Sequence, residues 1–130
     1  MNFQVGERIV GQTQQVELIQ LIKYAGASGD FNPLHFDFDY AKQKGQKAVL
    51  MHGMLGAGIL STLTTEIAGE SGFVKSFDVR FTKELLVDSS VTPEAMIEQV
   101  TEQQVNVQLM LKNEFGEIAT KGTAIISWDN

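Results

Sequence analysis

Hydrophobic residues recur with two different periods along this chain, and the change of period divides it into a helical part and a strand part. Leu18, Leu21, Ile22 and Ala25 fall at the spacing of one helix face. The pattern therefore predicts a helix over about residues 18–27. Further along, Asp37 or Asp39 is expected to cap a short helix that ends at Gly45.

The most apolar helix is expected over about residues 53–67. Its apolar side chains point in nearly every direction around the helix axis: Met54, Leu55, Ala57, Ile59, Leu60, Leu63 and Ile67. A helix that is hydrophobic all round is buried on all sides, so this segment is predicted to be the central element of the fold. Its glycines, Gly53, Gly56 and Gly58, cost helix propensity and are expected to let other backbone approach closely.

After the helical part the apolar period becomes 2, which is typical of strands. The expected strands cover residues 8–16, 77–81, 87–100, 105–111 and 118–128, with a hairpin turn at Asn113–Gly116. The first of them alternates only partially and suits an edge strand. Pro93 interrupts the third, which predicts an edge position or a bulge there.

This order of elements predicts one α+β domain spanning residues 1–130. One long buried helix and one curved antiparallel sheet suggest that the sheet wraps around the helix. A single sheet of that length leaves an outer edge and a face to cover, so self-association is expected.

Composition narrows the classes of function. The 130 residues carry ten Lys and Arg against sixteen Asp and Glu, and a net charge of −6 argues against non-specific nucleic-acid binding. Without cysteine the chain has no disulfide, thiolate metal site or cysteine nucleophile. No signal peptide and no membrane-length apolar run are evident, so we expect a cytoplasmic, soluble protein that does not bind membranes.

The candidate chemistry lies in the irregular segment from Asp30 to Phe36. Asp30 and His35 are the carboxylate and imidazole that a turn would force together, which is a suitable pair for acid/base work on one proton. Pro33 pushes Asn32 out of the helical region. The plainer alternative is an Asx-type turn with His35 simply packed, and the local residues leave both interpretations open.

Metal binding is the other interpretation of this segment. Its oxygen-rich pattern fails as a calcium loop, because His35 stands where the glycine is needed and Ala41 where the chelating glutamate is needed. A transition-metal site would need His35, His52 and a carboxylate to converge without regular ligand spacing. We therefore favour acid/base chemistry over a metal.

His52 and Gly53 open the apolar helix, where free backbone N–H groups and the positive end of the helix dipole attract a negative oxygen. Gly53 has no side chain, so a ligand oxygen could reach its N–H as in an oxyanion hole. Alternatively His52-Gly53 is only a break before the helix, and Ser61 bonds back to its own helix. Because the acid/base loop supports the same chemistry, we prefer the functional interpretation.

The stretch from Tyr24 to His35, then Ala41, then His52-Gly53-Met54-Leu55, resembles the MaoC-like (R)-specific enoyl-CoA hydratases of the hot-dog fold, also called hydratase 2. The Gly-Asp-x-Asn-Pro-x-His core and the downstream His-Gly-Met stand at the family's spacing. The resemblance covers nearly the whole chain and weakens after about Lys83.

The resemblance implies a long helix wrapped by a curved antiparallel sheet, and a homodimer whose sheets join edge to edge. It also implies reversible syn addition of water to a trans-2-enoyl thioester, giving an (R)-3-hydroxyacyl thioester, without a cofactor. By position, Asp30 and His35 would activate one water and shuttle its proton, and the Gly53 N–H would polarise the thioester carbonyl. Ser61 matches a residue that lines the pocket, and Asn32 one that shapes the loop.

The chain departs from the family's pattern at two places. Relatives often have a proline and a Gly-Asp turn where this chain has Lys83–Ser90, which leaves the strand path uncertain and the chemistry untouched. Relatives often have Gly-Phe and a proline where it has Gly45–Met51, which leaves the pocket rim and the acyl-length preference open.

Three further functions compete with a hydratase acting on acyl-CoA. One is the 3-hydroxyacyl-acyl-carrier-protein dehydratase of fatty acid synthesis; another is a non-catalytic thioester-binding partner subunit, against which the intact Asp30/His35 pair speaks. A hot-dog thioesterase would not need the Asp-x-Asn-Pro-x-His core. Some basic residues could bind CoA phosphates or an acyl-carrier protein: Lys42, Lys44, Lys47, Arg80 and Lys83. Single surface charges, however, are usually only solvated.

Overall fold

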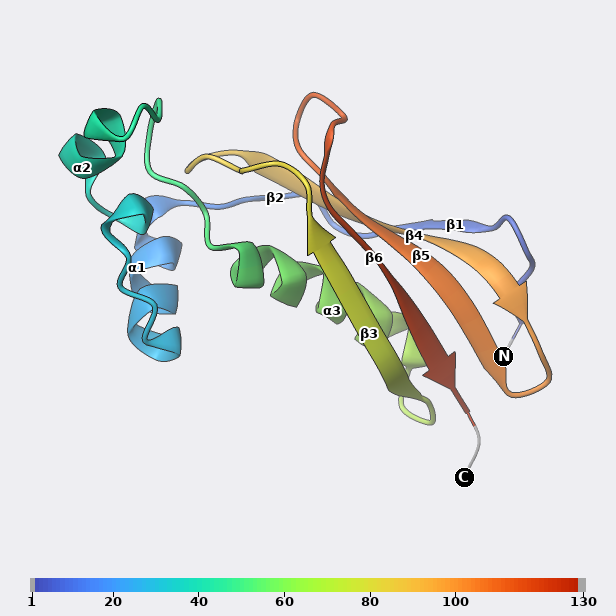
Figure 1. The fold of residues 1–130 in the computed structure, drawn as a ribbon. Coiled ribbons are helices and arrows are strands. Elements are labelled where there is room, and N and C mark those ends of the chain that lie inside the picture. The colour runs from blue at the N-terminus through green and yellow to red at the C-terminus, as the bar shows by residue number, and fades with distance from the viewer. Residues whose placement is uncertain (1, 129–130) are drawn as a thin grey trace.

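The computed structural model describes residues 2–128, which form a curved antiparallel sheet packed against a central helix (Figure 1). The strands are β1 Arg8–Val10, β2 Gln14–Gln15, β3 Phe73–Phe81, β4 Ser90–Val100, β5 Gln104–Lys112 and β6 Ile118–Ser127. The helices are α1 Leu18–Ser28, the 3₁₀ turn η1 Pro33–His35, α2 Phe38–Gln43 and α3 Gly53–Ala68. The strand order is β1-β4-β5-β6-β3, and β2 also pairs with β4. The α+β prediction is confirmed.

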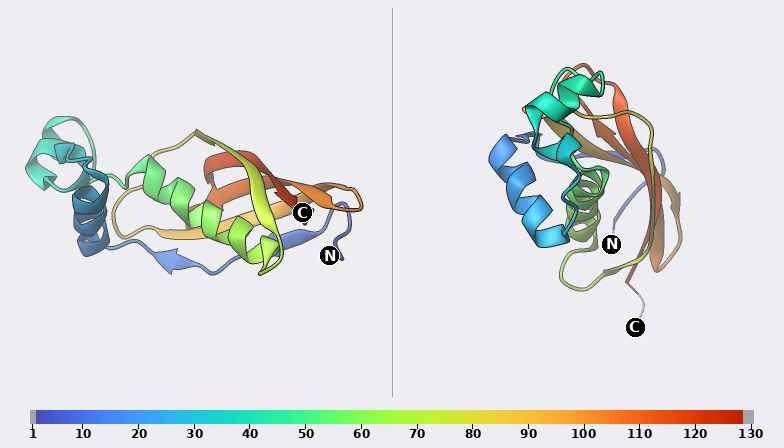
Figure 2. Two further views of the ribbon diagram at one scale, coloured as in Figure 1. Left: turned by 90° about the horizontal axis from the view of Figure 1, so that it is seen from below. Right: turned by 60° about the vertical axis from the view of Figure 1, so that its left-hand side comes forward.

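The core lies between α3 and one face of the sheet. Every second residue of β5 is buried: Val105, Val107, Leu109 and Leu111. These side chains share one cluster with Leu60 and Leu63 of α3. Helix α3 contacts β3, β4, β5 and β6, and Figure 2 shows it lying inside the curve of the sheet. The period-2 pattern of the sequence is thus the inner face of the sheet.

Helix α3 is not buried on all sides, contrary to the sequence prediction. Met54 is 62% exposed, and Gly58, Thr62 and Thr65 are exposed on the same side of the helix. The sheet covers α3 from one direction only, and the segment with α1 and α2 extends past its N-terminal end (Figure 2). One face of the helix is therefore open in the single chain.

The glycines of α3 make room for side chains, whereas the sequence prediction was close approach of backbone. A Cβ at Gly53 would lie 3.2 Å from the Phe81 ring, and one at Gly56 would lie 3.1 Å from a methyl group of Leu111. At Gly58 nothing lies within 4 Å of that position. Gly53 is thus the point where the ring of Phe81 approaches the start of the helix.

Pro93 is neither on an edge strand nor at a bulge, so that prediction is wrong. β4 lies between β1 and β5, and its irregularity falls between Ile97 and Gln99. The carbonyl of Pro93 accepts the Gly11 N–H at 2.8 Å, so the missing N–H of Pro93 faces the gap between β1 and β2. The proline therefore costs the ladder with β5 no hydrogen bond.

The N-terminal part differs from the prediction in detail. The expected strand over residues 8–16 is split into β1 and β2, and β1 lies at the sheet edge as predicted. Asp37 caps α2 by accepting the Tyr40 N–H at 3.1 Å. None of the helices in residues 2–128 is long and apolar enough to cross a membrane. Edge-to-edge pairing of two sheets stays a prediction, for which β3 offers the opposite edge.

The two segments that depart from the family's pattern lie against each other. Met51 donates its N–H to the carbonyl of Leu85 at 2.8 Å, and Val87 donates to the carbonyl of Val49 at 3.0 Å. Leu50 and Leu86 form a β-bridge between these bonds. This pairing settles the path between β3 and β4, and it places that path beside the start of α3.

Candidate active site

The loop after α1 holds Asp30 by two local hydrogen bonds. Gly29 ends the helix in a left-handed conformation with φ of 78°, which suits glycine because it has no Cβ. Asp30 donates its N–H to the hydroxyl of Ser28 at 3.1 Å, and Asn32 donates its N–H to Oδ1 of Asp30 at 3.3 Å. Oδ2 of the half-exposed carboxylate is left to face His35.

Asn32 and Pro33 build the turn that delivers His35. The Oδ1 atom of Asn32 accepts the Leu34 N–H at 3.0 Å, and its carbonyl accepts the His35 N–H at the same distance. Asn32 has φ of −58° and ψ of 123°, the extended conformation that a following proline requires. The Asx-type turn is therefore present, and it places the imidazole next to the carboxylate.

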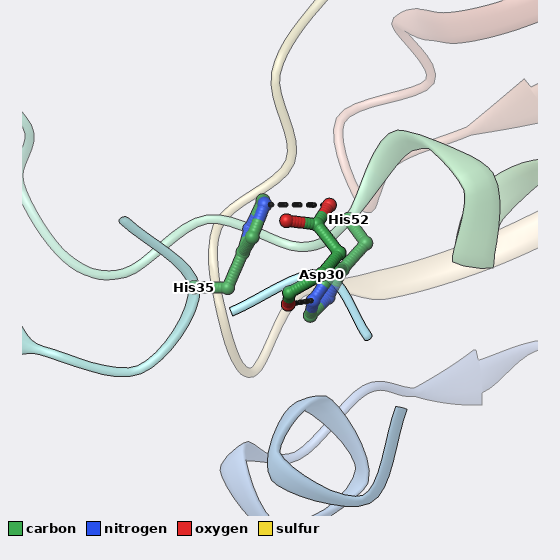
Figure 3. A group of neighbouring side chains, drawn as sticks. All are labelled: Asp30, His35 and His52. Carbon is green, nitrogen blue, oxygen red and sulfur yellow. Dashed lines mark hydrogen bonds and ion pairs between the residues drawn. The ribbon is translucent and has the colours of Figure 1, made fainter. Parts of the chain in front are cut away.

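The imidazole of His35 has one nitrogen that faces Asp30 (Figure 3) and one that the backbone of Leu50 holds. Nδ1 lies 2.9 Å from the carbonyl oxygen of Leu50, and since a carbonyl only accepts, Nδ1 carries the proton. Nε2 lies 3.6 Å from Oδ2 of Asp30, which is too long for a direct hydrogen bond. When the ring is neutral, Nε2 of His35 and Oδ2 of Asp30 are both hydrogen-bond acceptors, so a third group can donate to both.

His52 completes a cluster with Asp30 and His35. From the sequence, its side chain was expected only as part of the helix start or as a metal ligand. Its imidazole is 1% exposed and stacks on His35 with ring centroids 3.8 Å apart and planes inclined by 20°. Its Nε2 lies 3.3 Å from the carbonyl oxygen of Asp30 (Figure 3). Tyr24 meets the ring edge-on at 4.8 Å. The spacing of these residues along the chain gave no signal for this stack.

Burial lowers the pKa of His52, and a positive charge on His35 would lower it further. The carbonyl and the carboxylate of Asp30 act in the opposite direction but do not reverse the shift. Tyr24 also contacts the ring, and Lys83 and Glu84 line the same cleft as His52. His52 is therefore a neutral imidazole at pH 7.

We expect the stability of the protein to fall as the pH drops below about 6.5, the ordinary pKa of histidine. In this range His52 binds a proton in the unfolded chain but stays neutral in the folded protein. The free energy of unfolding therefore declines by up to about 1.4 kcal/mol per pH unit. Urea unfolding at pH 7.5 and 5.5 measures this decline. The variant His52→Gln should show a smaller decline than the wild type, and equal declines would contradict the prediction.

The cluster brings together the three residues that a transition-metal site would need, but the rings have the wrong orientation. Ligand atoms of Asp30, His35 and His52 lie within 4.8 Å of one another. The lone pairs of stacked imidazoles lie in nearly parallel planes and do not converge on one ion at about 2.0–2.1 Å. One nitrogen of each ring already faces a carbonyl oxygen. The geometry favours acid/base chemistry.

Gly53 is the first residue of α3, where its N–H has no acceptor within the helix. It shares with His35 a cleft of about 360 Å³. The other lining residues are Leu50, Met51, His52, Gly56, Phe81, Thr82, Lys83, Glu84, Leu85 and Thr120. Both segments that depart from the family's pattern thus form walls of this cleft, next to the candidate chemistry.

The structure does not bring Ser61 to this cleft. Ser61 lies about 12 Å along α3 from Gly53, given the rise of a helix, and its hydroxyl donates to the Gly58 carbonyl at 2.9 Å. Two of the five basic residues lie apart from each other. Lys83 forms an ion pair with Glu117, while Arg80 lies in a separate, open depression of about 640 Å³ over β3, β5 and β6.

The chain is similar to proteins of one family. The model of the MaoC like domain matches residues 2–115. An (R)-specific enoyl-CoA hydratase of Aeromonas caviae is 26% identical over 110 residues, which are 82% of this chain and 82% of that protein. A second, from Rhodospirillum rubrum, is 34% identical over 70 residues, or 53% of this chain and 49% of that protein.

Solved structures share the fold. The (R)-hydratase from A. caviae involved in PHA biosynthesis superposes with a TM-score of 0.89 at 23% identity, covering 98% of both chains. The ChsH1-ChsH2 complex from Mycobacterium tuberculosis gives 0.83 at 22% identity, covering 95% of this chain and 96% of that one. The helix wrapped by a curved sheet is therefore the hot-dog fold, as predicted.

Proposed function

Because this chain belongs to the MaoC-like domain family, we propose that it catalyses the reversible hydration of a trans-2-enoyl thioester to an (R)-3-hydroxyacyl thioester. One observation carries the proposal. Oδ2 of Asp30 and Nε2 of His35 face each other at 3.6 Å, and His35 shares its cleft with the first N–H of α3 at Gly53. This arrangement supports an acid/base pair that works together with a donor for an oxyanion.

The acid/base pair would hold the attacking water. With Nδ1–H of His35 bound to the Leu50 carbonyl, Nε2 is an acceptor, and so is the carboxylate of Asp30. A water between these atoms can donate one hydrogen to each, which directs its oxygen lone pairs outward to the substrate. Proton transfer by such a positioned pair contributes about 10²–10⁴-fold to the rate.

The Gly53 N–H would act on the other end of the substrate. As the water oxygen bonds to C3, the π electrons of the alkene move onto the thioester oxygen as an enolate. A preorganised N–H at the positive end of α3 stabilises that charge, an effect worth about 3–4 kcal/mol per donor. Because Gly53 has no side chain, the thioester oxygen can approach its N–H closely. The ring of Phe81, which lies 3.2 Å from where a Cβ of residue 53 would be, bounds the space on that side.

The proton balance closes on the same pair. The water loses one proton to Asp30 and His35 as the C–O bond forms, and the pair returns it to C2 as the enolate collapses. Because both steps use one face of the substrate, water adds syn. No oxidant or cofactor enters the balance, and dehydration is the same path in reverse.

We propose a CoA thioester as the substrate, as in the names of the hydratases from A. caviae and R. rubrum. Some similar structures carry other names, such as HadBC, a 3R-hydroxyacyl-ACP dehydratase complex, and ChsH1-ChsH2 is also a complex. The paired Asp30 and His35 favour a catalytic chain over a non-catalytic partner subunit. We propose that it acts as a homodimer.

The wild-type protein is expected to remove the enoyl absorbance of crotonyl-CoA and to form (R)-3-hydroxybutyryl-CoA, which chiral chromatography identifies. Turnover of the same acyl group on an acyl-carrier protein, measured in parallel, tests the choice of carrier. A profile from C4 to C12 defines the acyl length. Failure to hydrate any of these thioesters, by a folded protein at micromolar concentration, would exclude the proposed reaction.

A further inference from the structure

His52 links the elements of the site, although the proposed reaction assigns its side chain no step. Its imidazole touches the loop through the backbone of Asp30 and touches η1 through the ring of His35. Its own backbone leads directly into Gly53 and α3. One buried side chain therefore contacts or adjoins all three groups to which the reaction gives a role.

The hydrogen-bond partners fix opposite tautomers in the two stacked rings. Nδ1 of His35 carries its proton toward the carbonyl of Leu50, whereas Nε2 of His52 carries its proton toward the carbonyl of Asp30. Nδ1 of His52 has no hydrogen-bond partner among the described residues. The other tautomer of His52 would set a lone pair against the Asp30 carbonyl and bury an unpaired N–H, which is unfavourable.

We propose that His52 is a positioning residue: as a neutral ring it holds the Asp30 backbone and the His35 imidazole in register with Gly53. This inference rests on the proposed function. The ring stack limits rotation of His35, and the Nε2–H limits movement of Asp30 relative to the start of α3. Both effects bear on kcat, since misplacing reacting groups by about 1 Å can cost 10²-fold.

The two contacts of His52 can be separated by substitution. Gln reaches as far as Nε2 of histidine and keeps a donor for the Asp30 carbonyl while it loses the stack. Phe keeps a ring against His35 and loses the donor. Asn is one methylene shorter than Gln and serves as the matched control, because its amide does not reach the carbonyl.

The experiment compares His52→Gln, His52→Phe and His52→Asn by steady-state hydration of crotonyl-CoA and by thermal unfolding. We expect His52→Asn, which loses both contacts, to lower kcat by about 10²-fold, and His52→Phe, which keeps the ring, to lower it by about tenfold, with KM changed less than about threefold in both. His52→Gln, which keeps the donor, should have a kcat about tenfold higher than His52→Asn. A merely structural role would instead make kcat follow the loss of Tm. Equal kcat losses for Gln and Asn, or wild-type kcat in His52→Phe, would overturn the inference.

A second measurement does not depend on activity and so separates this inference from the proposed function. Nitrogen-15 spectra of the folded wild-type protein at pH 7.5 report which ring nitrogen carries each proton. We expect a proton on Nε2 of His52 and on Nδ1 of His35. The ¹³Cα shift of Asp30, which follows its backbone conformation, should stay near the wild-type value in His52→Gln and move in His52→Phe. A proton on Nδ1 of His52, or an unmoved ¹³Cα shift of Asp30 in His52→Phe, would contradict the inference even if no thioester is hydrated.

Discussion

Replacing Asp30 with asparagine is expected to lower kcat for crotonyl-CoA hydration by about 10²–10⁴-fold, with KM nearly unchanged. Asparagine keeps the size of the side chain and its hydrogen bond from the Asn32 N–H, but its amide is a much weaker base. The water would still sit beside Nε2 of His35, without a carboxylate to share its proton. Initial rates of absorbance loss over a range of substrate concentrations measure both constants.

Asp37→Asn is the matched control, because it makes the same chemical change seven residues along the chain. Asp37 caps α2 by accepting the Tyr40 N–H, and asparagine caps helices equally well. Its kcat should therefore remain within about twofold of the wild-type value, a variation of about 0.4 kcal/mol in activation free energy. Similar losses in Asp30→Asn and Asp37→Asn would assign the effect to charge near the loop rather than to water activation.

The pair also makes a prediction about additivity. If Asp30 and His35 act on one water, Asp30→Asn combined with His35→Ala should cost little more than the worse single variant, because groups that act as a unit are non-additive. Independent roles would instead multiply the two losses. The double variant therefore distinguishes a shared water from two separate contributions.

The periodic segments of this fold were predictable because their pattern reflects direct contact with the core. The alternation of Val105, Val107, Leu109 and Leu111 gave β5, and the apolar run after Gly53 gave α3. Exposure was harder to predict. The hydrophobicity of α3 indicated burial from every side, whereas the sheet covers it from one side and leaves Met54 open. The hydrophobicity of a helix indicates that it packs in the core, but it does not indicate how many other elements surround the helix.

Pro93 shows a second limit of the sequence. A proline in a strand needs a place where no N–H is required, and the sequence suggested the outer edge or a bulge. The actual place is the gap between β1 and β2, which depends on where the first strand breaks, more than eighty residues earlier. Such pairings between distant segments leave no periodic signal in either segment.

The candidate site, like the fold, has a part that the sequence predicted and a part that it did not. Asp30, Asn32 and His35 were predictable as a group because a local turn sets their geometry. The Leu50 carbonyl and the His52 ring reach them from fifteen and twenty-two residues away, through the packing of a second loop. Local sequence therefore predicted the side chains that we propose to react, but it missed the groups that fix their tautomer and orientation.

Gly53→Pro is expected to lower kcat by about 10²–10³-fold, because it removes the N–H that would stabilise the enolate oxygen. Proline is well tolerated at the first position of a helix, where the N–H has no intrahelical acceptor. The preceding residue, His52, has φ of −59° and ψ of 132°, which is the conformation a residue before proline adopts. The fold should therefore accept the change, and circular dichroism with thermal unfolding verifies this. Crotonyl-CoA hydration measures kcat.

Gly53→Ala separates the missing N–H from the added bulk. Alanine keeps the donor but places a Cβ 3.2 Å from the Phe81 ring, which is half-exposed and able to move by the few tenths of an ångström required. We expect Gly53→Ala to lose about tenfold at most, so the further loss in Gly53→Pro measures the donor. If both variants lose activity equally, the Phe81 wall limits the reaction and the oxyanion must be stabilised elsewhere. Adding Phe81→Leu to each variant tests this, since it relieves the contact and should rescue Gly53→Ala but not Gly53→Pro.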